Sequence, residues 1–421
     1  MSTTIISGVE FGPIIVNSAN DTYNIKQGAT LLTSDTGMSV AAAIIENVDN
    51  PTVNHDNIYN VNGRVIGGEV GIYTVGARDK ITIGSSGEVE GTYGIAFAGK
   101  NTQMVNNGEV LAGIDGYAIY AFSSPGSEIH NNGLAAGGAG IFYQGPNGLI
   151  VNGADGLITG NNVGVIVSLS GMNANVAHSA QAAGSAGAGP VTTFINHGKV
   201  IVSDGTAAFA ADGVNVSIVN DGLIKGVVAL GDGDSVFDNR GGTVTSTIIG
   251  GGGDDVLIVD AAKYKLLEEA SGGTDTVKST VTYKLSVNVE NLTLIGNADI
   301  DGTGNIGDNT IRGNAGNNEL KGLAGADDLF GGKGNDKLFG GADGDEFHFA
   351  TGDGHDKVMD MIQGTDKIDF SGWDAVDSFT KVKSHAQDQG DDVLITAGSD
   401  SVLIVGLHKA DLTAGDFVFA T

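Results

Sequence analysis

The stretch GNAGNNELKGLAGADDLFGGKGNDKLFGGADGDEFH, from Gly313 to His348, decides the fold of this chain. It divides into consecutive nine-residue units, each with glycine first, an acid or amide sixth and an apolar residue eighth. Glycine permits a tight turn because it adopts positive φ without steric cost. The sixth residue then offers an oxygen ligand of the kind that calcium prefers. The end of each unit predicts a short strand with one inward-pointing side chain, which is Leu320, Leu329, Leu338 or Phe347.

These units resemble the calcium-binding nonapeptide repeats of RTX proteins. Gly250 to Ile258 is a further full unit, and Gly304 to Arg312 is a weaker one. Between them, Gly272 to Gly296 is similar to the spacer of secreted bacterial RTX proteins, and Gly352 to Trp373 is similar to the segment that closes the roll in RTX proteases and lipases. A glycine-rich linker would not place an apolar residue at every eighth position. The resemblance implies a parallel β-roll whose successive units stack and bind several Ca²⁺ ions between their turns.

The resemblance also implies which residues bind calcium. The sixth positions of the units hold Asp255, Asn309, Asn318, Asp327, Asp336 and Asp345. The turns add Gly325, Gly334, Asn335 and Asp343. Asp356 occupies the equivalent of the sixth position one turn on, and Asp360 and Asp366 match the closing acidic residues of the family. Because Asn309 and Asn318 are neutral, we expect weaker calcium binding at the start of the block. The sequence departs from the pattern at Leu323, in place of the second glycine, and at Asp343, in place of the fourth-position glycine.

A longer period runs through the first 245 residues. Turns such as Asn62-Gly63 and Asn107-Gly108 recur at a spacing of roughly 20 to 25 residues, each with an alternating strand before it and two short strands after it. Three strands per repeat predict the coils of a right-handed parallel β-helix. Asparagine suits such turns, and stacked asparagines could form a ladder. A sandwich of antiparallel strands stays the alternative, because turn spacing alone does not distinguish the two folds.

The predicted chain is therefore all-β, a parallel β-helix followed by a calcium-binding β-roll. We expect an N-terminal cap with the first coil at 1–55 and the β-helix at 56–245. A loop rich in alanine, glycine and serine interrupts the β-helix at 171–190. The β-roll follows at 246–370 with a spacer at 260–300, and a C-terminal cap with a secretion signal occupies 371–421. A helical composition occurs at Asp260 to Ala270, where we nevertheless expect a loop or strand.

Composition narrows the possible partners. The chain has 50 acidic and 21 basic residues and a formal net charge of -29, which argues against nucleic acid and against anionic membrane surfaces as partners. Bound calcium would reduce the self-repulsion of this charge. There is no cysteine, so no disulfide cross-links the fold. No stretch approaches the roughly 20 apolar residues that a membrane span requires.

The two ends of the chain indicate where it works. The start, MSTTIISGVEFG, lacks the features of a cleavable signal peptide. RTX proteins typically leave the cell through a type I channel, and the ending HKADLTAGDFVFAT resembles their uncleaved C-terminal signal. We therefore expect the type I secretion machinery as a partner and a location outside the bacterial cell or at its surface. Phe417, Val418 and Phe419 would also fit a last strand of the domain.

Signals of catalysis are sparse. The chain has no GxSxG, HExxH or Walker-type motif, and Arg78-Asp79-Lys80 is a compact charged cluster that a solvated turn explains. We assign no catalytic residue and expect a structural, adhesive, matrix or surface-layer role, with polysaccharide binding or assembly of homo-oligomers. A polysaccharide lyase or epimerase on the β-helix is the alternative. Internal stacking is the favoured placement for the recurring aromatic residues, although an outside row would suit sugar rings: Tyr73, Tyr93, Phe97, Tyr117, Tyr120, Phe142 and Tyr143.

Overall fold

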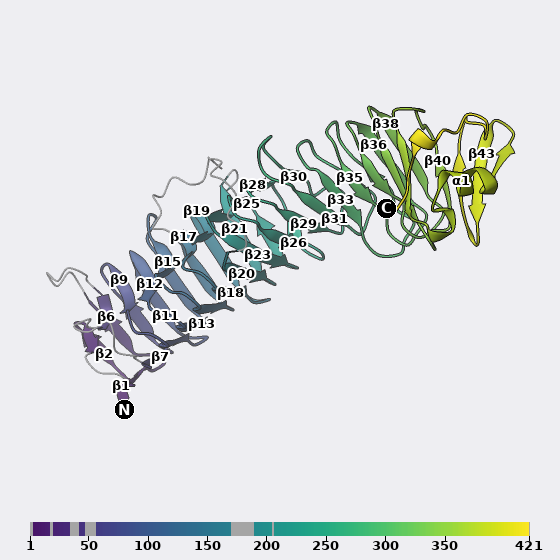
Figure 1. Cartoon of the computed structure of the whole chain (residues 1–421). Coiled ribbons are helices and arrows are strands. Elements are labelled where there is room, and N and C mark those ends of the chain that lie inside the picture. Colours follow the sequence, from purple (N-terminus) through teal and green to yellow (C-terminus); the bar gives the residue numbers. More distant parts are fainter. Residues whose placement is uncertain are drawn as a thin grey trace. The chain divides into compact units, whose positions relative to one another are not determined.

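The computed structural model describes residues 3–16, 20–33, 42–46, 56–169, 189–203 and 206–420, which form strands and turns almost throughout (Figure 1). The chain divides into two compact units, Met1–Gly253 and Asp254–Thr421. Parts of the predicted N-terminal cap at 1–55 lie outside the described residues. The predicted loop at 171–190 also lies outside them, apart from its last two residues.

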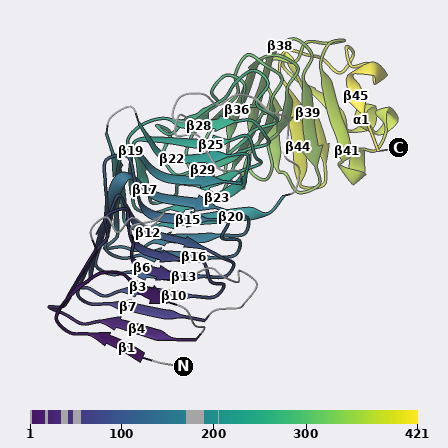
Figure 2. The same cartoon turned by 90° about the vertical axis from the view of Figure 1, so that its left-hand side faces the viewer.

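The first unit is a parallel β-helix with three strands per coil. Its strands lie stacked on one another in Figure 2. The first strand of each coil joins one sheet: β1 (Thr3–Ile6), β4 (Thr22–Ile25), β7 (Ile58–Val61), β10 (Lys80–Ile83), β13 (Gln103–Asn106), β16 (Glu128–Asn131), β18 (Leu149–Asn152), β20 (Val191–Asn196), β23 (Asn215–Asn220) and β26 (Val236–Asp238). Neighbouring strands are parallel and in register, with Met104 opposite Ile129, for example. The parallel pairing confirms the β-helix and rules out the antiparallel sandwich.

The second and third strands of each coil form a second sheet in the same unit. In β17 and β19 the two strands merge into one long strand. The members of this sheet are β2 (Val9–Phe11), β3 (Ile14–Val16), β5 (Thr30–Leu32), β6 (Ala42–Glu46), β8 (Arg64–Ile66), β9 (Val70–Thr74), β11 (Glu88–Gly91), β12 (Tyr93–Ala98), β14 (Glu109–Ala112), β15 (Tyr117–Phe122), β17 (Leu134–Gln144), β19 (Leu157–Ser168), β21 (Lys199–Val202), β22 (Ala207–Asp212), β24 (Leu223–Lys225), β25 (Val227–Gly231), β27 (Thr243–Val244) and β28 (Ile248–Gly251).

A ladder of buried asparagines links the coils of the first unit. Each side-chain amide donates to the amide oxygen of the next asparagine, at 2.6 to 2.9 Å. The predicted ladder is therefore present, at or just after the ends of the six strands β13, β16, β18, β20, β23 and β26: Asn106, Asn131, Asn152, Asn196, Asn220 and Asn239. A hydrogen bond of this kind contributes about 1 kcal/mol net. Neutral side chains thus connect these coils without any ion.

The Arg78-Asp79-Lys80 run lies at a coil corner. Asp79 is fully buried, and its Oδ1 accepts the backbone N–H of Asn57 one coil earlier at 3.0 Å. Arg78 has a positive φ of 63° and pairs with Asp56 at 2.8 Å. The solvated-turn interpretation is right for Arg78 and wrong for Asp79, because Asp79 connects two coils.

The second unit is a β-roll with two strands per coil. One sheet contains β29 (Val256–Val259), β31 (Thr276–Ser279), β33 (Asn291–Leu294), β35 (Thr310–Arg312), β37 (Asp328–Phe330), β39 (Glu346–Ala350), β41 (Lys367–Gly372) and β45 (Phe417–Val418). The opposite sheet contains β32 (Tyr283–Lys284), β34 (Gly302–Thr303), β36 (Glu319–Ala324), β38 (Lys337–Ala342), β40 (His355–Val358), β44 (Asp400–Ile404), β43 (Asp392–Ala397) and β42 (Ala386–Gln389).

Two nine-residue units make one coil of this roll. Asp328 in β37 lies opposite Glu346 in β39, and hydrogen bonds between equivalent turns join residues 18 apart. The expectation that successive units stack is therefore wrong: a unit stacks on the second unit along, while its immediate neighbour belongs to the opposite sheet. The predicted inward side chains are confirmed, since Leu320, Leu329, Leu338 and Phe347 are all fully buried.

The C-terminal part adds structure that the repeat does not predict. It contains an α-helix, α1 (Phe379–His385), the 3₁₀ turns η2 (Asp374–Val376) and η3 (Ala414–Asp416), and antiparallel pairing of β42, β43 and β44. The predicted last strand is confirmed as β45, although it ends at Val418. At Asp260 to Ala270 the structure has turns and the short strand β30 (Leu266–Leu267), as expected.

Candidate calcium centres

The sixth residue of each nonapeptide lies immediately before a strand and is buried. Asp327, Asp336 and Asp345 are each only 1% exposed. In each, Oδ1 accepts the backbone N–H of the equivalent residue one coil earlier, as when Asp327 accepts from Asn309 at 2.8 Å and Asp345 from Asp327 at 3.0 Å. The sequence position thus becomes a ladder of side chains that runs along each edge of the roll.

The second carboxylate oxygen of these residues indicates a cation site. Oδ2 of Asp327, Asp336 and Asp345 is buried, and no side-chain or backbone group in the described part of the chain hydrogen-bonds it. A buried charge without a partner is costly, and a bound cation removes that cost. The donor set of carboxylate oxygens with nearby backbone carbonyls is the one that Ca²⁺ prefers. These residues therefore fit calcium.

The first glycine of each unit keeps the space beside this oxygen open. A Cβ on Gly322, Gly331 or Gly340 would lie 2.0, 2.5 or 2.1 Å from Oδ2 of the aspartate five residues later. None of these glycines has a positive φ, so backbone conformation does not explain glycine at the first position. Its function is to leave room for the carboxylate and its ligand.

Positive φ occurs instead at the second and fourth positions. Gly325 and Gly334 have φ of 99° and 128°, and a Cβ on Gly334 would lie 2.4 Å from the carbonyl oxygen of Gly316. Leu323 and Asp343, the two departures from the pattern, also adopt positive φ, at 95° and 77°. A bulky residue in this region costs roughly 1–3 kcal/mol. The repeat geometry is thus retained even where the sequence departs from glycine.

Burial shifts the acid–base behaviour of these carboxylates. Burial, reinforced by neighbouring carboxylates, raises the pKa of Asp327 and Asp336 to about 7 and that of Asp345 to about 6. Burial likewise raises the pKa of Asp356 to about 8. Protons and calcium therefore compete for the same oxygens near neutral pH.

Asn309 and Asn318 occupy the same position in the turn as these aspartates, and their side chains are hydrogen-bonded without an ion. Both are buried, and the Nδ2 of Asn318 donates to the carbonyl of Ile300 at 2.5 Å while Asn309 donates to that of Val289 at 3.0 Å. Their Oδ1 atoms accept backbone N–H groups. The amide nitrogen thus takes the position of Oδ2 and binds a carbonyl directly. This geometry favours a hydrogen-bonding role, and calcium binding by these two residues stays a prediction.

The remaining predicted ligands lie around the same turns. Asp356 accepts the N–H of Asp336 at 2.9 Å, and Asp360 accepts that of Gly340 at 2.9 Å. Asp366 accepts two backbone N–H groups, one on each oxygen, which suits a capping role. Exposed side chains of Asn335 and Asp343 accept the N–H groups of His355 at 3.1 Å and Gly325 at 3.3 Å, respectively.

The spacer continues the ladder with residues that the sequence interpretation missed. Asp255 is fully buried and donates its N–H to Oδ1 of Asp275 at 2.9 Å, and Asp275 donates in turn to Glu290 at 2.8 Å. Asp275 follows Gly272-Gly273 and precedes Val277 by two residues. This short pattern, a glycine pair followed by an acid and then an apolar residue, could have identified it.

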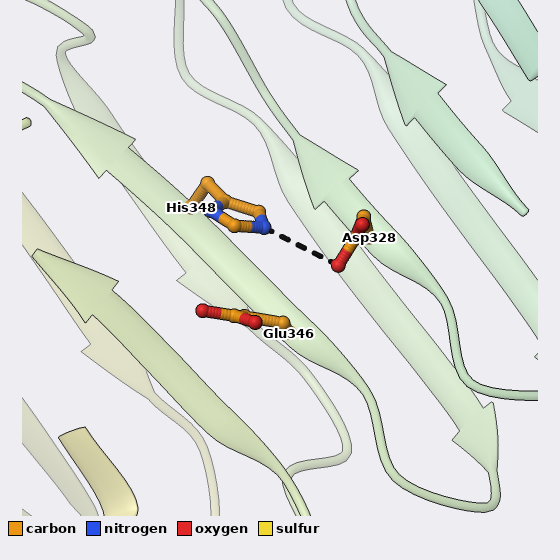
Figure 3. A group of neighbouring side chains, drawn as sticks. All are labelled: Asp328, Glu346 and His348. Atoms are coloured by element: carbon orange, nitrogen blue, oxygen red, sulfur yellow. Dashed lines mark hydrogen bonds and ion pairs between the residues drawn. The ribbon is translucent and has the colours of Figure 1, made fainter. Parts of the chain in front are cut away.

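A separate acidic group lies on the outward face of β37 and β39. Figure 3 shows Asp328, Glu346 and His348 close together. His348 Nδ1 lies 2.9 Å from an oxygen of Asp369 and Nε2 lies 3.5 Å from Asp328. Its ring stacks on Phe330 with centroids 3.9 Å apart. Because both ring nitrogens face carboxylates, these contacts connect neighbouring coils without requiring an ion.

Exchanging amide and acid in the ladder tests which positions bind calcium. Asn318→Asp places a carboxylate oxygen opposite the Ile300 carbonyl oxygen, and a cation between the two oxygens removes their repulsion. We therefore expect the full chain to bind one more Ca²⁺. Asp336→Asn is expected to bind one fewer. The measurement is the calcium-to-protein ratio after equilibrium dialysis. Asn317→Asp is the matched control, since it adds the same charge at an exposed neighbour. Equal ratios for Asn318→Asp and Asn317→Asp would contradict the assignment.

Comparison with known proteins agrees with this geometry. A model of the RTX calcium-binding nonapeptide repeat matches residues 240–261, 303–338 and 322–358. One similar solved structure is the crystal structure of the extracellular lipase LipA from Serratia marcescens, with 18% identity over 54% of this chain and a TM-score of 0.23. The match spans 40% of the lipase chain. No curated protein sequence matches significantly. Among the described residues, no helix is long and apolar enough to cross a bilayer.

Proposed function

We propose that this calcium-binding RTX β-solenoid acts outside the cell as an adhesive or matrix protein whose first unit binds polysaccharide. The RTX repeats support secretion, because proteins with such repeats typically leave the cell by the type I route, and the C-terminal sequence resembles the corresponding signal. The observation that supports polysaccharide binding is a row of half-buried aromatic rings on the β-helix.

The aromatic row lies on the outward face of the third strands in the first unit. Its rings contact one another along β9, β12 and β15, with centroids 5.0 to 6.2 Å apart. The members are Tyr73, Tyr93, Tyr117, Tyr120 and Phe122. By contrast, Phe97 and Tyr143 point inward and are fully buried, and Phe142 packs beneath the row. The expected internal placement is thus right for Phe97 and Tyr143, although neither ring stacks on another aromatic ring of the described residues, and it is wrong for the tyrosine row.

A groove lies beside this row at the corner between the second and third strands. It has a volume of about 450 Å³ and is lined by Ile66, Gly67, Glu90, Gly91, Leu111, Ala112 and Gly113. Glu90 belongs to an exposed cluster with Arg64, which it contacts at 2.6 Å. The groove crosses several coils. Such a path suits an extended polymer better than a compact ligand.

Aromatic faces and sugar rings are chemically matched. The flat π face of tyrosine packs against the apolar C–H face of a sugar, while the hydroxyl at the rim can hydrogen-bond. Rings spaced along successive coils can contact successive sugars of one chain. The half-buried environment raises the pKa of Tyr117 and Tyr120, so both hydroxyls stay neutral donors. The surface therefore offers both packing and hydrogen bonds to a polysaccharide.

The test is retardation of the full, calcium-loaded chain in native gels that contain a neutral polysaccharide, or alginate or pectin as uronic-acid polymers. We expect Tyr120→Ala to weaken binding about fivefold, because one stacked ring contributes on the order of 1 kcal/mol. Tyr120→Phe keeps the ring and should retain most of the affinity. Wild-type chain that is not retarded by any polymer, or Tyr120→Ala that binds as tightly, would overturn the proposal. Growing absorbance from an unsaturated sugar product would favour a lyase instead.

A further inference from the structure

Three acidic side chains converge in the spacer of the second unit. One carboxylate oxygen from each of Asp255, Glu268 and Asp275 lies within 4.8 Å of the others. Two oxygens bound to one calcium ion lie at most about 5 Å apart, because each Ca–O bond is roughly 2.3–2.6 Å long. The spacing therefore fits a single shared ion.

Asp275 provides an independent indication of a ligand. Its side chain is fully buried, and its Oδ1 accepts the backbone N–H of Asp255 at 2.9 Å. Its Oδ2 is buried and has no hydrogen-bond partner among the described residues. This is the arrangement found at Asp327, Asp336 and Asp345 in the nonapeptide coils. Burial also raises the pKa of Asp275, to about 6.

Glu268 comes from the part of the spacer where the nonapeptide pattern is broken. It follows β30, and its backbone carbonyl accepts a hydrogen bond from the side chain of Asn288 at 3.0 Å. The nearby Lys265 directs its ammonium to the carbonyl of Lys284 and lies 4.0 Å from the ring centroid of Tyr283. The segment is thus held in place by the next coil, and its lysine is engaged away from the carboxylates.

We propose that Asp255, Glu268 and Asp275 bind one Ca²⁺ ion, which cross-links the spacer as calcium cross-links the nonapeptide coils. Glu268 and Asp275 lie outside the residues that the repeat model matches. The inference rests on the calcium binding in the proposed function and extends it to a segment without nonapeptides.

The experiment counts calcium ions on the full-length protein after equilibrium dialysis at neutral pH. Glu268→Gln and Asp275→Asn are each expected to bind one ion fewer than the wild type. Glu268 is only partly buried, so its variant should fold, and Glu269→Gln is a matched control on the exposed neighbouring residue. Hydrogen–deuterium exchange of residues 260–275 should increase in the first two variants and stay at the wild-type level in the control.

Two results would overturn the proposal in distinguishable ways. If the wild type binds calcium and both Glu268→Gln and Asp275→Asn bind the same number of ions, the spacer site is absent while the nonapeptide sites stand. If the wild type binds no calcium at all, the calcium part of the proposed function fails as well.

Discussion

Chelating calcium at neutral pH is expected to unfold the nonapeptide coils of the second unit and to leave the first unit folded. Without a cation, Asp327, Asp336, Asp345 and Asp356 place buried carboxylates against one another. Each buried, uncompensated charge costs on the order of several kcal/mol. A domain is stable by only about 5–15 kcal/mol in total, so four such charges are enough to unfold it.

The chain contains its own reporter for this experiment. Trp373 is the single tryptophan, and it is buried in the second unit against Phe370. Chelator should shift its fluorescence to that of an exposed indole, and hydrogen–deuterium exchange should show loss of protection in β36 to β39. Peptides from β13 to β25 are the internal control. Readdition of calcium should restore the signal, whereas magnesium should not, because it requires a tighter octahedral site. Unchanged Trp373 fluorescence in excess chelator would sink the prediction.

The two units differ in the side chains that form the ladders between their coils. In the first unit the ladder at the strand ends consists of neutral asparagines such as Asn131 and Asn152, and each of these two amides both donates and accepts. In the second unit the ladder lies immediately before the strands and uses aspartate, such as Asp327 and Asp345, which accepts only. An amide ladder is complete by itself, whereas a carboxylate ladder requires cations. Calcium dependence therefore follows from the choice of side chain within otherwise similar parallel coils.

The sequence predicted the roll well because its period is strict. The apolar eighth position fixes which side chain points inward, as Leu329 and Phe347 show. It also located the ladder residues Asp327 and Asp336, because one fixed offset separates them from the glycine that makes room for them. Periodicity does not say which unit stacks on which. Pairing at 18 residues depends on the two-sheet cross-section, which is a property of the folded coil.

Other features depend on contacts that no single period encodes. Glu268 approaches Asp275 only because the irregular spacer folds beside the ladder. Tyr120 and Phe97 occur in similar strands, and their opposite directions depend on the register of each strand within the coil. The helix α1 is short and has few helix-favouring residues, so packing of its Val382 stabilises it rather than local propensity.

Acidification is expected to restore order to the second unit in the absence of calcium. Burial raises the pKa of Asp345 to about 6, of Asp336 to about 7 and of Asp356 to about 8, against about 4 in an unfolded chain. The calcium-free folded state therefore binds more protons than the unfolded state across this interval. Its stability is fully present below about pH 4 and is lost as the pH rises through 6 to 8.

The measurement is Trp373 fluorescence in excess chelator between pH 5.5 and pH 8.5. This pH range lies above the isoelectric point of about 4.3, so the chain keeps a net negative charge throughout. The indole should be buried at the acidic end and exposed at the alkaline end. Asp336→Asn removes one titrating carboxylate and should shift the midpoint to higher pH, while Asn317→Asp should leave it nearly unchanged. Order that increases with pH in the calcium-free chain would refute the assignment of these aspartates as the destabilising groups.

With calcium present, the sign of the pH effect reverses. An ion binds the deprotonated carboxylate, so each protonated aspartate must release its proton first. At pH values below the pKa of such an aspartate, the calcium affinity falls about tenfold per pH unit for each proton that the ion displaces. Calcium affinity should therefore rise from pH 6 to pH 8 and level off above it. The same buried oxygens thus make the roll stable with protons at low pH and with calcium at neutral pH, and unstable only where neither ligand is available. A secreted chain passes from low calcium to high calcium at nearly constant pH, so calcium alone would decide where the second unit folds.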